Sequence, residues 1–188
     1  MRLKTDLTFQ DFLEMEQMER MFYSEEFIAP AEEAMRWYEA HPFSVKVVEA
    51  AGDIAGFMNL FPVVPSVAKA VSHGGFNDHD LKAEDIQSPD QANWPLQLFL
   101  SCIVVRSSNR HTGVVSLLMN SYFEEIDSWG KEIRGVWMET VTEDGAQFAQ
   151  RIGMKQVKCK LATTVWQIDY EKLKRHFIRS TTGANVSV

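Results

Sequence analysis

The residues best suited to chemistry lie in a window that lacks acidic side chains. Residues 91–123 contain no Asp or Glu, although Asp and Glu outnumber Lys and Arg by 26 to 19 in the whole chain. Within the window, Arg106, Arg110 and His111 precede Gly113, which stands where a helix is expected to begin. Backbone N–H groups and the dipole of a helix N-terminus attract an anion. The pattern predicts a site for a phosphate-bearing ligand, with simple packing at the helix start as the alternative.

Glu139 is the candidate acid–base residue. It is the only carboxylate in residues 135–141, a run expected to form a strand. Carboxylates are seldom buried in a strand without a purpose. Glu139 is therefore expected to act as a general base or to bind a cationic substrate, unless its side chain faces solvent or pairs with an arginine.

Other titratable residues gather in two connections. Glu25 and Glu26 lie between two expected helices, where solvated loop acids are the first interpretation and substrate contacts the second. The longer connection holds His73, Asp78, His79 and Asp80. Their spacing fits no standard metal site, so they are expected at the surface and no metal is expected.

A mixed sheet with flanking helices is expected to position these residues. The apolar run 98–105 is typical of a central strand, and a helix at 113–130 leads to the strand 135–141. A strand, helix and strand at this spacing form a right-handed crossover, so these two strands are expected to be parallel. The fold class is α/β (α+β), with a mostly antiparallel sheet and a central parallel pair. The remaining expected elements are helices at 8–21, 30–41, 142–153 and 170–177, a hairpin at 45–50 and 54–61, a half-buried strand at 157–161 and a strand at 163–168.

The length of 188 residues predicts one domain. Residues 62–95 lose the periodic pattern, gain prolines and glycines, and contain one short helical candidate at 80–86. Connections of this length are often lids or binding loops, and a plain surface insertion is the equal alternative. The domain is expected to span residues 1–178 with this insertion, followed by a polar tail at 179–188.

Charge and composition exclude several classes of protein. The net charge of −7 argues against broad binding to nucleic acid or to an anionic membrane. No apolar run reaches the length of a membrane span, and residues 1–11 are too polar for a signal peptide, so a cytoplasmic location is expected. Cys102 and Cys159 lie in apolar-alternating runs without a CxxC pattern, and both are expected as buried, reduced thiols.

The loop before the expected helix has a more specific pattern. From Val105 it reads Val-Arg-Ser-Ser-Asn-Arg-His-Thr-Gly-Val-Val. It resembles the acetyl-CoA loop of the GNAT family of N-acetyltransferases, whose pattern is Val, four loop residues, Arg or Gln, two residues, Gly, one residue, and Gly or Ala. Val105, Arg110 and Gly113 match in place, whereas Val115 stands where the family prefers Gly or Ala. The resemblance extends to the order of the expected elements and to a Gly-Met pair at 153–154, where the family has Gly-Phe.

The resemblance implies acetyl-CoA as the cofactor. Backbone groups of Ile103 and Val105 would pair with the pantetheine arm, and N–H groups of the loop and helix start would hold the pyrophosphate. That cradle comprises Arg110, His111, Thr112, Gly113, Val114, Val115 and Ser116. The resemblance also implies that the two parallel strands diverge so that the thioester enters between them.

The implied reaction is transfer of an acetyl group to a primary amine of a small molecule or peptide. It needs a base, for which Glu139 is the candidate, a donor to the oxyanion and an acid for the leaving thiolate. The family commonly has its acid, a Tyr, at the position of Ala149, so the usual acid is absent. Tyr170, Tyr122 or a water could replace it, although Tyr122 is expected in the core. Thr142 is expected to cap the helix at 142–153 in place of the family's frequent Asn.

Two other functions stay open. A catalytically silent CoA-binding or regulatory protein on the same scaffold would account for Ala149 and Val115, and a structural domain would need Gly113 only for close packing. The insertion at 62–95 is expected to shape acceptor specificity, so a short Gly/Ser link in its place is expected to change acceptor use and to keep CoA affinity. A homodimer is also left open.

Overall fold

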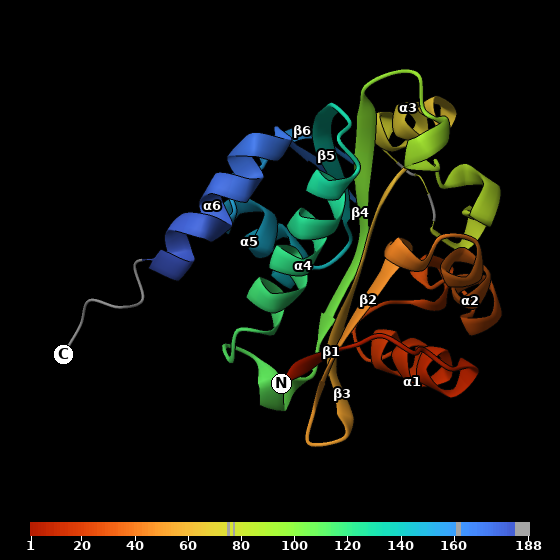
Figure 1. Ribbon diagram of the computed structural model, residues 1–188, viewed down its shortest axis with the longest axis vertical. Coiled ribbons are helices and arrows are strands. Elements are labelled where there is room, and N and C mark those ends of the chain that lie inside the picture. Colours follow the sequence, from red (N-terminus) through yellow and green to blue (C-terminus); the bar gives the residue numbers. More distant parts are fainter. Residues whose placement is uncertain (75, 77, 161–162, 183–188) are drawn as a thin grey trace.

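A mixed β-sheet forms the centre of the molecule (Figure 1). The computed structural model describes residues 1–74, 76, 78–160 and 163–182. The strands are β1 (Arg2–Lys4), β2 (Val45–Ala50), β3 (Asp53–Pro62), β4 (Leu96–Val105), β5 (Ile133–Thr140), β6 (Lys155–Cys159) and β7 (Thr164–Ile168). They pair in the order β1-β2-β3-β4-β5-β7-β6, and all pairs are antiparallel except β4 with β5. The expected fold class and its parallel pair are confirmed.

Helices cover both faces of this sheet (Figure 1). They are α1 (Phe9–Glu19), α2 (Ala31–Ala40), α3 (Pro65–His73), α4 (Val114–Ser128), α5 (Glu143–Arg151) and α6 (Tyr170–Thr182). α4, α5 and α6 pack on one face, while α1, α2 and α3 pack on the other. Within the described residues, no helix has both the length and the apolar character needed to cross a membrane.

Helix α4 is fixed on the sheet by the apolar side chains that recur along one of its faces. Leu118, Tyr122 and Ile126 of that face are buried. The Tyr122 hydroxyl donates to the Met58 carbonyl at 2.7 Å and accepts from the Leu60 N–H at 3.2 Å. Tyr122 is therefore a core residue, as expected, and it anchors the middle of α4 on β3.

The connection between β3 and β4 is folded. It contains α3, which the sequence pattern did not predict, because a buried strip of only Val67, Ala68 and Val71 is too short to set a helical period. It also contains 3₁₀ turns at Asp78–Asp80, Ala83–Asp85 and Pro89–Gln91. The helix expected at 80–86 is wrong, since that stretch forms 3₁₀ turns followed by a bridge between Val63 and Ile86.

The same connection contributes to a hydrophobic core. Val71 and Leu81 are fully buried in one cluster with Trp37 and Phe61. The Trp37 indole N–H donates to the Leu81 carbonyl at 3.2 Å. A short Gly/Ser link in place of this connection would uncover these rings, so such a replacement would test stability together with acceptor specificity.

The C-terminal elements differ from the expectations. The strand expected at 157–161 is present as β6 at Lys155–Cys159, but its expected half-burial is wrong, because β6 is the edge strand of the sheet and all five of its residues are exposed. Cys159 lies in β6 and is exposed, whereas Cys102 is buried as expected. Helix α6 extends to Thr182, so the tail expected at 179–188 is helical in its first residues. Residues 161–162 and 183–188 lie outside the described residues.

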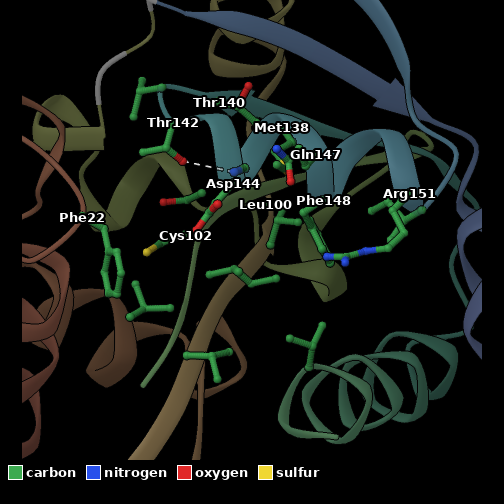
Figure 2. Close-up of a pocket in the computed structure, with 18 of the residues that line it drawn as sticks. Phe22, Leu100, Cys102, Met138, Thr140, Thr142, Asp144, Gln147, Phe148 and Arg151 are labelled. Carbon is green, nitrogen blue, oxygen red and sulfur yellow. Dashed lines mark hydrogen bonds between the residues drawn. The ribbon is translucent and has the colours of Figure 1, made fainter. Parts of the chain in front are cut away.

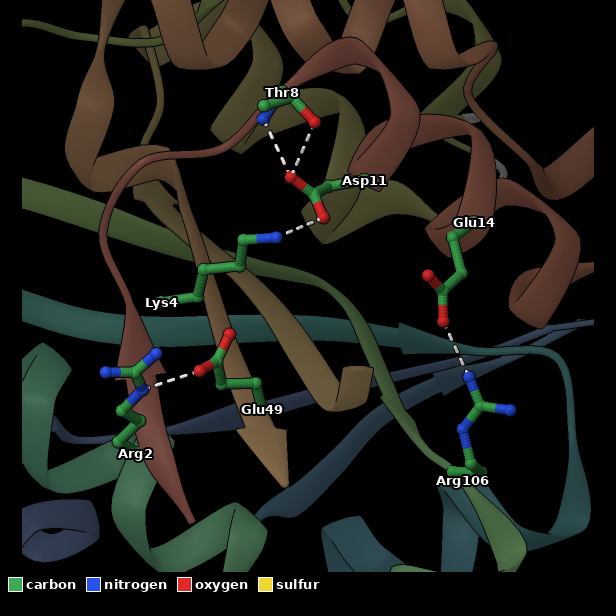
Figure 3. Close-up of polar contacts among 7 residues, drawn as sticks. All are labelled: Arg2, Lys4, Thr8, Asp11, Glu14, Glu49 and Arg106. Atoms are coloured by element: carbon green, nitrogen blue, oxygen red, sulfur yellow. Dashed lines mark hydrogen bonds and ion pairs between the residues drawn. The ribbon is translucent and has the colours of Figure 1, made fainter. Parts of the chain in front are cut away.

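Polar contacts fasten the N-terminus to α1 and β2 (Figure 3). Strand β1, which was not expected, carries Arg2 paired with Glu49 of β2 and Lys4 paired with Asp11 of α1, each at 2.5 Å. The Thr8 N–H also donates to Asp11 at 2.8 Å. Burial raises the pKa of Asp11, but the hydrogen bonds from Lys4 and Thr8 outweigh it and lower the pKa overall. Asp11 is therefore held as a carboxylate at the start of α1.

Candidate functional site

The two parallel strands separate at one end. Their pairing stops at Leu100 and Met138. Beyond that point β4 continues to Val105 beside β3, while Glu139 and Thr140 of β5 stay paired with β7. The divergence that the resemblance implies is confirmed.

A cavity of about 940 Å³ occupies this opening (Figure 2). Figure 2 shows Phe22, from the connection between α1 and α2, on one side of it and Arg151 of α5 on the other. Strand residues between them include Leu100, Cys102 and Met138. The cavity therefore passes between the two helical layers at the place where the sheet opens.

Ser101 forms a β-bulge where the strands separate. Consecutive residues of β3 pair with Cys102 and Leu100, so Ser101 is the extra residue of β4. A bulge shifts the alternation of side chains by one residue. Phe99 before the bulge and Cys102 after it both pack on the face covered by α1, α2 and α3. The bulge thus allows Ser101 and Cys102 to line the cavity together.

The backbone of β4 presents hydrogen-bonding groups to the cavity. The Arg106 N–H donates to the Ala55 carbonyl of β3 at 2.9 Å. Because the peptide groups of a strand alternate between its two edges, those of Ile103 and Val105 face the edge that β5 has left. The Tyr23 hydroxyl donates to the Ile103 carbonyl at 3.3 Å. This open edge can receive an extended ligand as an added strand would be received.

The loop before α4 turns sharply into the helix. His111 and Gly113 have positive φ angles of 65° and 91°, in the left-handed region that favours glycine. Helix α4 begins at Val114, and the first N–H groups of a helix have no carbonyl partner within it. The expected cofactor residues that line the cavity are Ile103, Val105, Arg110, His111, Gly113, Val114, Val115 and Ser116. Thr112 does not line it, because its hydroxyl turns back to the Asn109 carbonyl at 2.7 Å.

Arg106 and Arg110, the two arginines of residues 91–123, make different contacts. Arg106 pairs with Glu14 of α1 at 2.7 Å (Figure 3). It also donates to the Ile54 carbonyl at 2.9 Å. Arg106 therefore ties the end of β4 to α1 and β3. Arg110 lines the cavity, pairs with Asp144 of α5 at 3.2 Å and lies 5.6 Å from the Phe22 ring. Of the two side chains, Arg110 is the one placed to meet an anion in the cavity.

Helix α5 forms the wall beside β5. The Thr142 hydroxyl accepts from the Gly145 N–H at 3.1 Å, which confirms the expected N-cap (Figure 2). Ala149 is fully buried in the core, so a packed methyl group stands where the GNAT pattern commonly has its acid. Arg151 of α5 and His176 of α6 line the cavity and add to the basic groups on the side covered by α4, α5 and α6.

The cavity is acidic on its other side. Glu139 of β5 lines it together with Asp78, which the connection between β3 and β4 supplies. The Ser101 hydroxyl donates to the Asp78 carboxylate at 2.5 Å. The pKa of Asp78 is raised to about 7, chiefly by burial; the charge of Glu139 adds to the rise and the Ser101 hydrogen bond opposes it. Asp78 is partly buried and lines the cavity, so the expectation that it is a surface residue is wrong. Its local sequence could not indicate this, because the contact is with Ser101 of β4.

A further buried carboxylate lies beside Cys102. Glu19 of α1 is 9% exposed, and burial raises its pKa to about 8, although its hydrogen bond with Cys102 opposes the shift. Burial also raises the pKa of the Tyr23 phenol well above its ordinary value, so this hydroxyl keeps its proton. Glu19 and Tyr23 carry no signal in the sequence, because both follow the ordinary pattern of an amphipathic helix and the turn after it.

Other residues considered from the sequence lie away from the cavity. Among the described residues these are Glu25, Glu26, His73, His79, Asp80, Tyr122 and Tyr170. The Tyr170 hydroxyl donates to Asp127 of α4 at 3.1 Å, and Tyr122 is held in the core, so neither phenol is placed to act as the missing acid. No group of three or more His, Cys, Asp or Glu side chains in the described part of the chain is arranged to hold a metal ion.

Comparisons with known proteins agree with this geometry at the level of the fold. Models of protein families and curated protein sequences gave no match. A protein of Desulfovibrio desulfuricans described as a GNAT-family acetyltransferase is 14% identical, with a TM-score of 0.57 over 89% of this chain and 98% of that one. NAA60 of Arabidopsis thaliana, solved with acetyl-CoA, is 12% identical, with a TM-score of 0.56 over 86% and 94%. The GNAT-like decarboxylase GphF, solved with isobutyryl-CoA, is 18% identical, with a TM-score of 0.54 over 80% and 71%.

The protein therefore has the GNAT fold. Similarity at these identities establishes the fold alone, and a fold can host more than one chemistry. The D. desulfuricans protein is described as an acetyltransferase and GphF as a decarboxylase, so the activity of this chain has to be argued from its own residues.

Proposed function

We propose that the protein is an acetyl-CoA-dependent N-acetyltransferase whose acceptor is a primary amine of a small molecule or peptide. The observation that carries this proposal is the opening between β4 and β5. A bare strand edge, the start of a helix and two carboxylates meet in one cavity there. These are the groups needed to hold a phosphate-bearing acyl carrier and to bring an amine to it.

The residues present fit acetyl-CoA. Val114, Val115 and Ser116 line the cavity at the N-terminus of α4, where a pyrophosphate is stabilised by N–H groups and by the helix dipole. A Cβ placed on Gly113 would meet no atom within 4 Å, so the loop backbone is open to a ligand. Arg110 adds a positive charge beside it. Bound acetyl-CoA would supply a thioester whose carbonyl carbon an amine can attack.

The chain supplies hydrogen-bond donors on the open edge of β4. Because the bulge at Ser101 resets the strand, the Ile103 N–H faces this edge. We assign it the role of stabilising the negative charge that develops on the reacting carbonyl oxygen. The Tyr23 hydroxyl lies at the same edge and retains its proton, so we assign it the role of the acid that Ala149 cannot provide.

The second candidate function is a catalytically silent CoA-binding or regulatory protein. Two observations favour it, namely the buried methyl group of Ala149 and the ion pair of Arg110 with Asp144, which occupies the arginine when no anion is bound. Both functions require CoA binding, and only the first requires transfer to an amine.

Binding is tested by isothermal titration of acetyl-CoA and free CoA. Gly113→Trp is expected to abolish binding, because the indole would fill the pyrophosphate cradle. Gly130→Trp is the matched control, since Gly130 also has a positive φ and open space around it but lies beyond the other end of α4. Absence of binding by the wild type, or equal loss in both variants, would count against a CoA site at this loop.

Activity is tested by following release of the CoA thiol with a broad panel of primary amines. Amine-dependent release together with an acetylated product supports the acetyltransferase. Tight CoA binding without release for any amine in the panel supports the silent binding protein instead.

A further inference from the structure

The connection between β3 and β4 is anchored so that one of its turns reaches the cavity. The 3₁₀ turn Asp78–Asp80 is held on one side by His79, whose Nδ1 lies 3.2 Å from the Ile28 carbonyl and must donate to it. On the other side the Ser101 hydroxyl binds Asp78. The turn therefore bridges the segment between α1 and α2 to the bulge of β4, and Asp78 lines the cavity there.

Two carboxyl groups from distant parts of the chain line the same cavity near the bulge. Asp78 comes from this turn and Glu139 from β5, and the charge of Glu139 acts on Asp78. Trp137 packs with α2 and α3 while Met138 packs with α4, so alternation places Glu139 on the same side of the sheet as Asp78. Two neighbouring acids in a partly enclosed space are stabilised by a cation between them.

Aromatic rings line the same cavity as these acids. Phe22 and Phe27 come from the segment between α1 and α2, and Phe76 comes from the connection that carries Asp78. Phe76 meets Phe99 of β4 edge to face, with ring centroids 5.8 Å apart. Rings of this kind stabilise a cation by its attraction to their faces and bury apolar groups. The acceptor side is thus acidic at its centre and apolar at its walls.

We propose that the acceptor is a small protonated amine carried on an apolar body, and that Asp78 removes its proton before the acetyl group is transferred. The inference rests on the proposed acetyltransferase function and deepens it. A small molecule is favoured over a peptide because the turn Asp78–Asp80 is tied to both Ile28 and Ser101 at the end of the cavity that holds the two acids.

The proposed transfer accounts for both protons that the nitrogen loses. The ammonium gives one proton to the Asp78 carboxylate, and the neutral nitrogen forms a bond to the carbonyl carbon while the carbon–sulfur bond breaks. The sulfur leaves as a thiolate and takes a proton from the Tyr23 hydroxyl, which in turn recovers a proton from the nitrogen. The products are the N-acetylated amine, the CoA thiol and protonated Asp78, which returns its proton to water.

The titratable groups around Asp78 come from several elements. The charge of Glu139 of β5 acts on Asp78, and Asp78 in turn acts on Cys102 of β4, Glu19 of α1 and Tyr23 after α1. His79 and Asp80 stand in the same turn but are not among the groups that shift its pKa. A base of raised pKa operates near neutral pH, where it is ionised and still holds a proton well. The rate is therefore expected to rise with pH through an apparent pKa near 7.

The test compares Asp78→Asn with the wild type and with Asp80→Asn, which removes the same charge from an exposed position of the same turn. The probes are 2-phenylethylamine, its uncharged analogue 2-phenylethanol, and the peptide trialanine. We expect Asp78→Asn to lower kcat at least about 100-fold, to weaken binding of 2-phenylethylamine to the CoA complex, and to keep acetyl-CoA affinity within about twofold. Asp80→Asn is expected to behave as the wild type.

Binding of the probes by calorimetry supplies a readout independent of turnover. The wild type is expected to bind 2-phenylethylamine at least about tenfold more tightly than 2-phenylethanol, because only the amine carries a charge between the two acids. Preference for trialanine, equal binding of amine and alcohol, or full activity of Asp78→Asn would overturn the inference while leaving acetyl-CoA binding intact. Failure of the wild type to bind acetyl-CoA would instead remove the proposed function, and this inference with it.

Ser101→Ala covers the case in which Asp78→Asn does not fold. The Ser101 hydrogen bond lowers the pKa of Asp78, so its removal is expected to shift the pH–rate profile to higher pH. A purely structural role of Ser101 would lower the rate at every pH without moving the profile, and an unmoved profile would contradict the role given to Asp78.

Discussion

Arg110 of the loop before α4 and Asp144 in the first turn of α5 form an ion pair of 3.2 Å across the opening between β4 and β5. Both side chains are partly exposed, with 44% and 68% of their surface accessible. An anion that binds at the start of α4 competes with Asp144 for this arginine. The ion pair therefore joins the loop before α4 to α5, and a bound anion can break it by taking the place of Asp144.

Asp144→Asn is expected to increase acetyl-CoA affinity. An exposed ion pair is worth up to about 1 kcal/mol, so freeing Arg110 is expected to tighten binding by about threefold to fivefold. Titration calorimetry at low salt measures the change, and Glu143→Gln is the control because it removes a charge from the same turn without breaking the pair. An equal gain in both variants would show that charge in the turn, and not the pair, sets the affinity.

Tyr23→Phe is expected to lower kcat by about 100-fold, because the variant lacks the hydroxyl that we assign as the acid. The acetyl-CoA dissociation constant is expected to change by less than about twofold, since the Ile103 carbonyl can bond elsewhere. Tyr38→Phe is the matched control, because the Tyr38 hydroxyl donates to the Thr5 carbonyl at 2.7 Å and does not line the cavity. If steady-state kinetics show that Tyr23→Phe keeps the wild-type kcat, Tyr23 is not the acid and water takes that role.

Glu19→Gln is expected to stabilise the protein at high pH. Burial raises the pKa of Glu19 to about 8 in the folded protein, against an ordinary value of 4.5. The folded state therefore holds this proton more tightly than the unfolded state, and the free energy of unfolding falls as pH rises from about 4.5 to 8. Glu19→Gln has no carboxyl group to ionise, so its free energy of unfolding does not fall in this pH range. At pH 8 the variant is therefore expected to be more stable than the wild type by roughly 2–4 kcal/mol, and at pH 4.5 about as stable.

Urea unfolding of Glu19→Gln at several pH values measures this difference. Glu26→Gln is the control, because Glu26 is exposed in the turn after α1 and its replacement is expected to leave the pH dependence unchanged. A constant difference between Glu19→Gln and the wild type at every pH would contradict the assignment.

Gly56→Ala is expected to disturb both stability and the cofactor loop. A Cβ on Gly56 of β3 would lie 2.7 Å from the Val104 carbonyl oxygen and 2.9 Å from the Val114 side chain, so the start of α4 has to move. The cost is expected to be about 2–3 kcal/mol, as for other overpacked sites, with weaker acetyl-CoA binding. Gly52→Ala adds backbone strain in an open hairpin turn and is expected to leave binding unchanged. Equal acetyl-CoA affinities in the two variants would contradict this coupling.

Much of the fold could be predicted from the sequence, because the hydrophobic pattern of a helix or strand repeats every two to four residues and can be recognised within a short segment. The 3.6-residue pattern of α4, the apolar run of β4 and the cap at Thr142 all depend on residues within a few positions of one another. The same holds for the loop from Val105 to Gly113, whose residue types set a turn into a helix start. Most of the expected cofactor residues therefore lie around one cavity.

Only the tertiary structure shows which residues meet on the proposed acceptor side of the cavity. Asp78 is 23 residues from Ser101 along the chain and Tyr23 is 80 from Ile103, so no local period relates them. The bulge at Ser101 lies within a nearly continuous apolar run and could not be predicted, because a register shift against β3 depends on the pairing of two strands that are distant in sequence. Sequence alone indicated a loop and helix start suited to a phosphate. Which acids line the same cavity depends on long-range packing, because only the folded chain brings Asp78 and Glu139 together.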